Sequence, residues 1–329
     1  MSAGLDRGIA SKPVHAPEVG GRLWLGGYTP RLSLGPADGM ALLAVAAWGL
    51  NYSISKQVLE GIAPLSGAFL RGLICAVLFA AVLLVARRWQ LPRRADVPRL
   101  LGVGLIGMTL NAVLYTEGLY RTSATHAGLI PALTPLVVFG LSHWQGSLRL
   151  GPRELVGLGL GLGGAVLIVG TPLLAGTDSG SATLVGDLLS AGSAIVWGLW
   201  MLAAMPLLRR YGTLVCTTWL TILSTVGLLP GALPGLLTMQ WETLTLPLLG
   251  GLAYWALVAG AIGGLLWYTA AGRIGAARTM IYANLQSFFA VLFAALLLGE
   301  VVEATALAGG LAVAIGVLLT RRASSEQTT

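Results

Sequence analysis

Long apolar runs, separated by short polar connections, dominate the sequence from about residue 37 onward. A run of about 20 mostly apolar residues is long enough to cross the hydrocarbon core of a bilayer as a helix. Ten such runs are found, at 37–58, 65–86, 98–119, 123–145, 153–172, 185–208, 213–232, 246–268, 276–299 and 303–320. The pattern predicts an all-α integral membrane protein with ten transmembrane helices.

The two halves of the apolar region resemble each other. The segment "AAWGLNY" at 46–52 resembles "IVWGLWM" at 195–201, and "LYTEG" at 114–118 resembles "WYTAAG" at 267–272. Each half holds five runs, and an odd number turns the second half upside down relative to the first. The sequence therefore predicts two inverted five-helix repeats, 37–172 and 185–320, with a solute site between them near the midplane.

Composition and charge agree with a membrane location. The chain is 56% hydrophobic and only 10% charged, with a net charge of +7. Of the 20 Lys and Arg residues, 17 fall on one side of the proposed topology, and only Lys56, Arg71 and Arg121 do not. Because positive charge collects in cytoplasmic loops, we expect an inner (plasma) membrane protein with both termini in the cytoplasm. The basic residues mark topology and give no nucleic-acid patch.

The terminal segments differ from the apolar region. Residues 1–36 are polar, rich in Gly and Pro, and have no apolar core of the kind a cleavable signal peptide carries. We expect them to be a disordered cytoplasmic tail and 321–329 to be a second tail on the same side.

A glycine-rich stretch, "ELVGLGLGLGGAVLIVG" at 154–170, contains a dinucleotide-binding spacing. That fingerprint needs a strand before the glycines, and here a helix start precedes them. The pairs Gly157–Gly161 and Gly159–Gly163 instead each share a helix face. Small residues at such positions let two membrane helices approach closely, so the stretch predicts a tightly packed helix.

Several motifs together resemble a known family. The segments "WGLNYSISK", "APLSGAFLRGL", "LYTEGLYRTSATHAGLIPALTPLV" and "LLLGE" are similar to the EamA-type branch of the drug/metabolite transporter superfamily, over about 37–320. The chain also resembles the bacterial aromatic amino-acid exporters of that branch. This resemblance implies transport of small solutes, usually export. The halves depart from one another where Leu148 stands opposite Glu300 and Pro135 opposite Ser287.

Polar and aromatic residues mark the candidate solute site. Trp48, Asn51, Tyr52 and Ser55 share one face of the first run, and Trp197 and Trp200 repeat part of that spacing in the sixth. Such a face lines a cavity or packs against another helix, and the sequence leaves both open. We expect substrate to contact Asn51, Tyr52, Tyr115, Trp197, Trp200, Tyr282 and Asn284.

Three further features involve charge or helix breaks. Arg71 lies deep in the second run, where a charge needs a partner or a water path. Glu117 and Arg121 have the spacing of a helical ion pair. Pro131 and Pro135 interrupt the fourth run and predict a kink, which serves as a gate or as a static bend.

These observations favour a transporter of small metabolites, such as aromatic or other apolar amino acids, working by alternating access around a central cavity. A membrane-embedded enzyme acting on lipid or peptide is the alternative, but GxSxG, HExxH and an intramembrane Asp pair are missing from the sequence. A channel would need a filter or charged ring. We expect no catalytic residue, metal or cofactor, and the expected partners are a solute and the bilayer, with the chain acting as a monomer.

Overall fold

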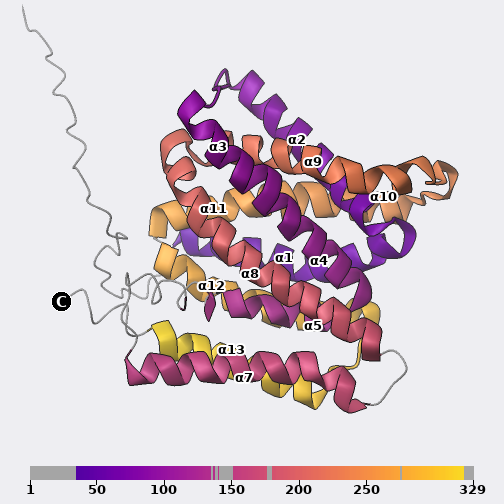
Figure 1. Cartoon of the computed structure of the whole chain (residues 1–329), viewed down its shortest axis with the longest axis vertical. Helices are drawn as coiled ribbons and strands as arrows, with labels where there is room; N and C mark the ends of the chain where they lie inside the picture. The colour runs from indigo at the N-terminus through magenta and orange to yellow at the C-terminus, as the bar shows by residue number, and fades with distance from the viewer. Residues whose placement is uncertain are drawn as a thin grey trace, which may run out of the picture.

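The computed structural model describes residues 35–134, 136–137, 140, 151–175, 180–274 and 276–321, which form a bundle of helices (Figure 1). The first part contains α1 (Pro36–Gly61), α2 (Pro64–Val85), η1 (Arg94–Asp96), α3 (Val97–Leu100), η2 (Leu101–Met108), α4 (Thr109–Arg121), α5 (Ala124–Leu129) and η3 (Ile130–Leu133). It is followed by α7 (Pro152–Ala175), α8 (Gly180–Tyr211), α9 (Thr213–Leu237), η4 (Trp241–Thr243), α10 (Leu246–Ala253), η5 (Tyr254–Gly263), α11 (Gly264–Ile274), α12 (Ala276–Leu298) and α13 (Ala304–Arg321).

The expected all-α membrane fold is confirmed over the described residues. Within the described residues, each of the ten apolar runs coincides with a helix or with consecutive helices, and the fourth run is described only in part. Five segments are long and apolar enough to cross a membrane, namely Pro64–Val85, Arg94–Arg121, Thr183–Trp200, Thr213–Leu237 and Leu246–Ala270. Shorter apolar helices occur at Leu155–Ile168, Leu285–Leu298 and Ala304–Gly316. That all ten runs cross the bilayer, as an inverted repeat, stays a prediction.

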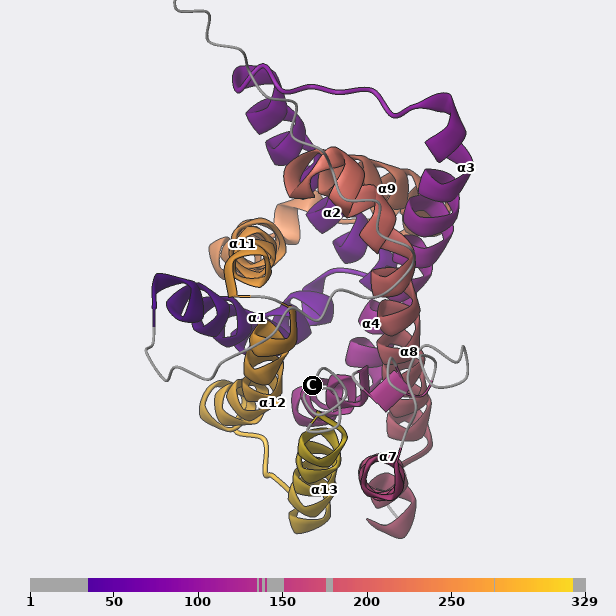
Figure 2. The same cartoon turned by 90° about the vertical axis from the view of Figure 1, so that its left-hand side faces the viewer.

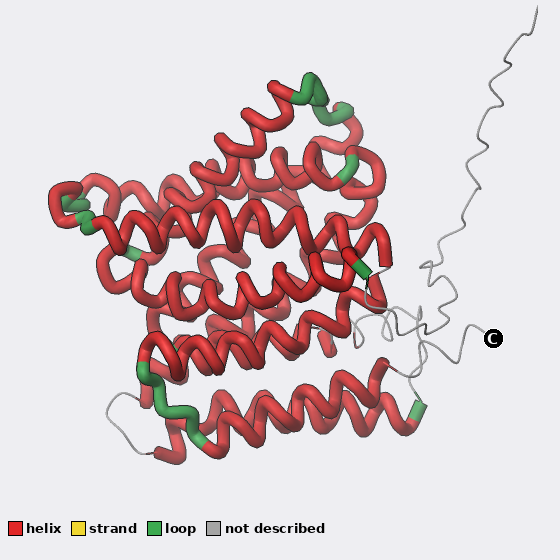
Figure 3. The backbone as a smooth tube through the Cα atoms, turned by 180° about the vertical axis from the view of Figure 1, so that it is seen from behind, coloured by secondary structure: helices red, strands yellow, loops and turns green. Residues whose placement is uncertain are grey.

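The helices lie side by side, and many of their connections gather at the two ends of the bundle (Figure 3). In sequence-distant pairs, α1 packs on α12, α2 on α9, α4 on α8 and α7 on α13. Large apolar side chains are exposed along the outside, including Val77, Val166, Leu296 and Leu311. Such a surface suits lipid better than water.

Two helices lose regular α-helical geometry at matching places. The π-helical segments η2 and η5 begin at Leu101 and Tyr254, an offset of 153 residues that falls in the range separating the similar motifs. π-Helical turns often occur at functional sites. Their equivalent positions give the two halves a shared irregularity next to the centre of the bundle.

Close packing of α7 on α13 accounts for one pair of glycines and not for the other. A Cβ atom on Gly316 of α13 would lie 2.5 Å from the carbonyl oxygen of Gly157 and 2.7 Å from the nitrogen of Gly161, and one on Gly164 would lie 2.5 Å from the carbonyl oxygen of Gly309. The expectation for the Gly157–Gly161 face is confirmed. The expectation for Gly159 and Gly163 is wrong, because a Cβ atom at either position would meet no heavy atom within 4 Å. Those two glycines face outward, roughly opposite the contact.

Charged groups at the two ends of the bundle are held by different contacts. At one end Arg210 donates to both carboxylate oxygens of Asp96, at 2.6 and 2.9 Å. At the other end Lys56 Nζ donates to the backbone carbonyls of Leu119, Tyr120 and Thr122. The ion pair expected between Glu117 and Arg121 is confirmed.

Candidate functional site

A cavity of about 400 Å³ lies between the two halves of the chain. Its walls come from α1, α2, η2, α4 and η3 of the first half and from α8, α9, η5, α11 and α12 of the second. Figure 2 shows α1, α11 and α12 on one side and α4 and α8 on the other. The paired helices α7 and α13 supply none of the described lining residues. The volume is that of a site for a small organic molecule.

Aromatic rings make up much of the cavity wall. Trp197 and Trp200 of α8 stack with ring centroids 4.8 Å apart and an interplanar angle of 22°. Trp48 lies against Trp267, at 5.3 Å. These rings, with Tyr52, Tyr115, Trp255 and Tyr268, all line the cavity. They offer flat apolar surface with a few polar atoms at the edges.

Hydrogen bonds between different helices hold several of these rings. Trp48 Nε1 donates to the carbonyl of Ala259 at 2.8 Å. Asn51 Nδ2 donates to the Tyr115 hydroxyl at 3.0 Å, and Gln286 Nε2 donates to the Tyr52 hydroxyl at 3.2 Å. Because both partners of each bond are anchored on helices, the cavity wall is shaped before any solute enters.

One face of α9 adds hydroxyl groups to the cavity. Thr217, Thr221, Ser224 and Thr225 line it, at the i, i+4, i+7 and i+8 spacing of a single helix face. The Thr225 hydroxyl donates to the Thr221 carbonyl at 2.8 Å. α9 therefore forms a polar strip opposite walls that are mainly aromatic.

Arg71 of α2 also lines the cavity. Its guanidinium carbon lies 5.7 Å from the centroid of the Trp255 ring, which is the geometry of a cation–π contact. A cation therefore reaches the cavity wall.

The structure brings together most of the residues expected at the solute site. Asn51, Tyr52, Tyr115, Trp197 and Trp200 all line the cavity. That they contact substrate stays a prediction, because no solute is present to test it.

Tyr282 is not among the lining residues. Its hydroxyl donates to Asp38 Oδ1 at 2.8 Å, at the start of α1. Its helical neighbours Ala283, Gln286 and Ser287 line the cavity instead, because the Tyr282 side chain reaches toward the start of α1, where its hydroxyl binds Asp38. The side chain of Asn284 lies outside the described part of the structure.

The fourth apolar run changes helical form where a proline was expected to disturb it. The α-helix α5 ends at Leu129 and a 3-10 helix follows over Ile130–Leu133, which contains Pro131. Pro131 itself lines the cavity. Pro135 lies outside the described residues. A gating role for either proline stays a prediction.

Several lining residues were missed by sequence reasoning. Tyr268 could have been found, since it lies 153 residues after Tyr115 in the aligned motifs "LYTEG" and "WYTAAG". Trp267 precedes it and follows from the same alignment. Trp255 and the α9 hydroxyls carried no comparable signal, because they lie outside the segments that resemble each other in the two halves.

His126 belongs to a cluster of buried polar side chains contributed by both halves of the chain. Its Nδ1 lies 2.8 Å from Asp187 Oδ2, and the Thr122 hydroxyl donates to Asp187 Oδ1 at 2.5 Å. All three side chains are buried. Glu300 nearby accepts hydrogen bonds from the backbone amides of Ala124 and Thr125 at the start of α5. This cluster joins the two halves outside the cavity.

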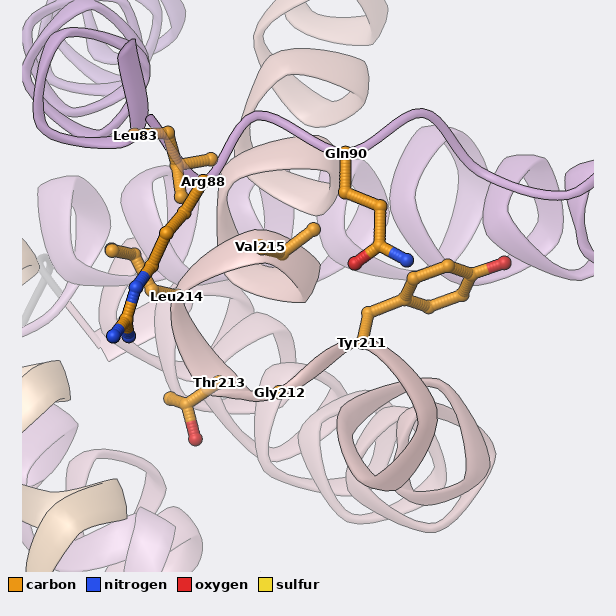
Figure 4. Close-up of a pocket in the computed structure, with 8 residues that line it drawn as sticks. All are labelled: Leu83, Arg88, Gln90, Tyr211, Gly212, Thr213, Leu214 and Val215. Carbon is orange, nitrogen blue, oxygen red and sulfur yellow. The ribbon is translucent and has the colours of Figure 1, made fainter. Parts of the chain in front are cut away.

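A second pocket lies where α8 turns into α9 (Figure 4). Leu83, Arg88, Gln90, Tyr211 and the residues that follow it line a volume of about 380 Å³. Gly212, at φ 76°, makes the turn. The Tyr211 hydroxyl is already engaged, donating to Asp96 at 2.5 Å and accepting from the Arg93 amide at 2.9 Å. This pocket holds no aromatic cluster and lies at the bundle end.

Comparison with known proteins gives a consistent result. The model of the EamA-like transporter family matches this sequence twice, over residues 35–170 and 184–322. The uncharacterized transporter YdeK of Bacillus subtilis is 30% identical over 79% of this chain and 88% of its own. A probable terminal-alkyne amino-acid exporter of Streptantibioticus cattleyicolor is 29% identical over 88% of this chain and 95% of its own.

A solved crystal structure resembles the whole bundle. It superposes with a TM-score of 0.61 over 90% of this chain and 100% of that one, at 16% sequence identity. At this identity the likeness concerns the fold.

Proposed function

This chain belongs to the EamA-like transporter family, and on that basis we propose that it carries small, largely apolar metabolites, aromatic amino acids among them, through the cavity between its halves. The observation that carries the proposal is the cavity wall, where rings from α1, α4, α8, η5 and α11 surround a volume of about 400 Å³. Stacked and tilted rings of this kind bind flat apolar groups well.

The polar groups of the wall favour a solute with one polar end. Neutral hydroxyl and amide groups line the cavity from Asn51, Asn111, Gln286 and the α9 strip. They can form neutral hydrogen bonds with the polar end of such a solute. A sugar phosphate is disfavoured, because a phosphate dianion is usually held by paired Arg or Lys side chains.

Export of amino acids is the specific activity we propose. It rests on the resemblance to bacterial aromatic amino-acid exporters and on the relative from Streptantibioticus cattleyicolor named as a probable amino-acid exporter. We place the protein in the inner membrane, with both termini in the cytoplasm, on the distribution of Lys and Arg.

The proposed mechanism is alternating access. An inverted repeat of 37–172 and 185–320 would let the two halves rock about a site at their interface. The 3-10 turn around Pro131 borders the cavity, and a helix interrupted by proline can bend there more easily than a regular α-helix.

The test is uptake into proteoliposomes containing the purified protein. A panel of labelled aromatic, branched and charged amino acids would be offered, with and without a pH gradient. We expect saturable accumulation of aromatic and branched amino acids and little of lysine or aspartate. Uptake equal to that of protein-free vesicles for the entire panel would contradict the proposal, and the pH gradient would decide whether protons are coupled.

A further inference from the structure

Arg71 differs from every other described residue that lines the cavity, because it alone carries a formal charge. The remaining walls are aromatic, aliphatic, or bear neutral hydroxyl and amide groups. With no carboxylate in the described lining, the cavity has a net positive charge.

The guanidinium of Arg71 also has no anionic partner among the described residues. Its Nε is buried and makes no hydrogen bond, and the ion pairs found in the described chain all involve other residues. The thiol of nearby Cys75 donates to the Ala256 carbonyl at 3.1 Å and accepts nothing from Arg71. The guanidinium instead lies over the neutral ring of Trp255 in a cation–π contact.

Four acidic side chains of the described residues are engaged elsewhere. Asp187 pairs with His126, Asp96 with Arg210, and Glu117 with Arg121. Glu300 accepts from the start of α5. A cation within a low-dielectric membrane interior is unfavourable without a counter-charge. An anionic group bound in the cavity would therefore stabilise the guanidinium of Arg71.

From this geometry we propose that Arg71 binds the carboxylate of the transported solute, and that the solute is recognised as an apolar carboxylate rather than through its amino group. The inference rests on the proposed transport function and names the chemical class that the cavity selects. Guanidinium and carboxylate form paired, charge-assisted hydrogen bonds.

The surroundings of Arg71 suit a carboxylate at that end of the cavity. The hydroxyl of Thr225 lies where α2 and α9 meet, since a Cβ atom on Gly72 would be 2.6 Å from it. The Thr225 hydroxyl donates to the Thr221 carbonyl, so the donors for a second carboxylate oxygen are the hydroxyls of Thr221 and Ser224, which also line the cavity. Trp255 beneath the guanidinium fixes its position, and the stacked pair Trp197–Trp200 supplies a surface for the apolar body.

The amino group of an amino acid finds no charged partner in the described lining. Neutral acceptors such as the Asn51 amide oxygen, which is buried without a hydrogen bond, can hold it only weakly. The carboxylate is therefore the group whose removal should abolish recognition.

The test is a direct binding measurement on the purified protein in detergent, using three probes that share a phenyl ring. 3-Phenylpropionate has the carboxylate alone, phenethylamine has the amine alone, and phenylalanine has both. We expect 3-phenylpropionate and phenylalanine to bind, and phenethylamine to bind at least about tenfold more weakly, as loss of a charged hydrogen-bonded pair implies.

Two variants assign the effect to Arg71. Arg71→Gln should weaken 3-phenylpropionate binding about tenfold or more and erase the preference over phenethylamine, whereas Arg71→Lys should keep part of it. Arg121→Gln, at the exposed pair near the bundle end, is the matched control and should bind as the wild type does. Size-exclusion profiles would show that each variant folds.

The outcomes separate this inference from the proposed function. Equal binding of amine and carboxylate probes by the wild type, binding of neither, or unchanged 3-phenylpropionate binding by folded Arg71→Gln would overturn the inference. Carboxylate-selective binding without uptake into proteoliposomes would support the inference and contradict the proposed function. A preference for phenyl phosphate over 3-phenylpropionate would overturn the carboxylate assignment.

Discussion

Trp200 offers a test of the cavity at the level of one side chain. Its ring stacks on Trp197 and lines the cavity, while its Nε1 is buried without a hydrogen bond. An aromatic stacking partner contributes about 0.5–1.5 kcal/mol beyond area burial. We predict that Trp200→Ala raises the apparent KM for an aromatic amino acid several-fold. Trp241→Ala, at an exposed ring in η4, is the control, and equal KM values in the two variants would argue against Trp200 as a binding residue.

Asp187 makes a different prediction, about stability. Its carboxylate is fully buried and holds both His126 and Thr122. Removing one partner of a buried pair costs about 3–5 kcal/mol, so Asp187→Ala should lower the melting temperature in detergent by several degrees. Glu117→Ala removes a partly exposed ion pair, which is worth about 0–1 kcal/mol, and should change it little. If both variants melt alike, the His126–Asp187 cluster contributes no special stability.

The contact of α7 with α13 is tested at the level of helices. Gly164 faces the backbone of α13, whereas a Cβ atom on the adjacent Gly163 would meet no heavy atom within 4 Å. A leucine at 164 must push the two backbones apart, and α13 cannot yield as a side chain can. We predict a strongly reduced yield of monodisperse protein for Gly164→Leu and a near-normal yield for Gly163→Leu, measured by fluorescence-detected size exclusion. Similar yields would contradict the close packing.

The helices themselves were the most predictable level of structure. Apolar runs of membrane length located each helix, because backbone groups in a bilayer must bond within the helix. The face of each helix that turns toward the cavity was harder to predict than the position of the helix along the sequence. The first and sixth runs carry aromatic residues at helical spacing. This spacing predicted the faces that line the cavity, at Asn51, Tyr52 and Trp197. In α12 the polar residues Tyr282 and Gln286 lie at i and i+4, yet Gln286 lines the cavity and Tyr282 bonds to Asp38.

Tertiary contacts determine the features around the cavity that the sequence did not predict. Arg71 was expected to need a partner, but only the fold shows that it reaches the cavity and lies over Trp255. The pairing of His126 with Asp187 joins residues 61 apart in the sequence. His126 lies in the family-like segment that begins at Leu114, but Asp187 lies outside every such segment, so no motif links the two residues. Local periodicity cannot predict contacts of this kind, because they depend on how helices from the two halves meet.

At the scale of the whole molecule, the orientation in the membrane can be tested by cysteine labelling. Cys75 and Cys216 are buried, so they give a low background with a membrane-impermeant maleimide. The charge distribution puts the connection between α2 and α3 in the cytoplasm and that between α9 and α10 outside. We predict that Thr238→Cys is labelled in intact cells and that the exposed position Ala95→Cys is labelled only after lysis. The reverse pattern would place both termini outside.

The central claim is that solute passes through the cavity between the halves. The most direct measurement is the initial rate of aromatic amino-acid uptake by proteoliposomes in which that cavity has been filled. Ala112 is half-buried on α4 and lines the cavity, whereas Ala81 is exposed on the outside of α2. We predict that wild type and Ala81→Phe transport at similar rates and that correctly folded Ala112→Phe loses most uptake. Equal uptake by all three proteins would contradict the claim.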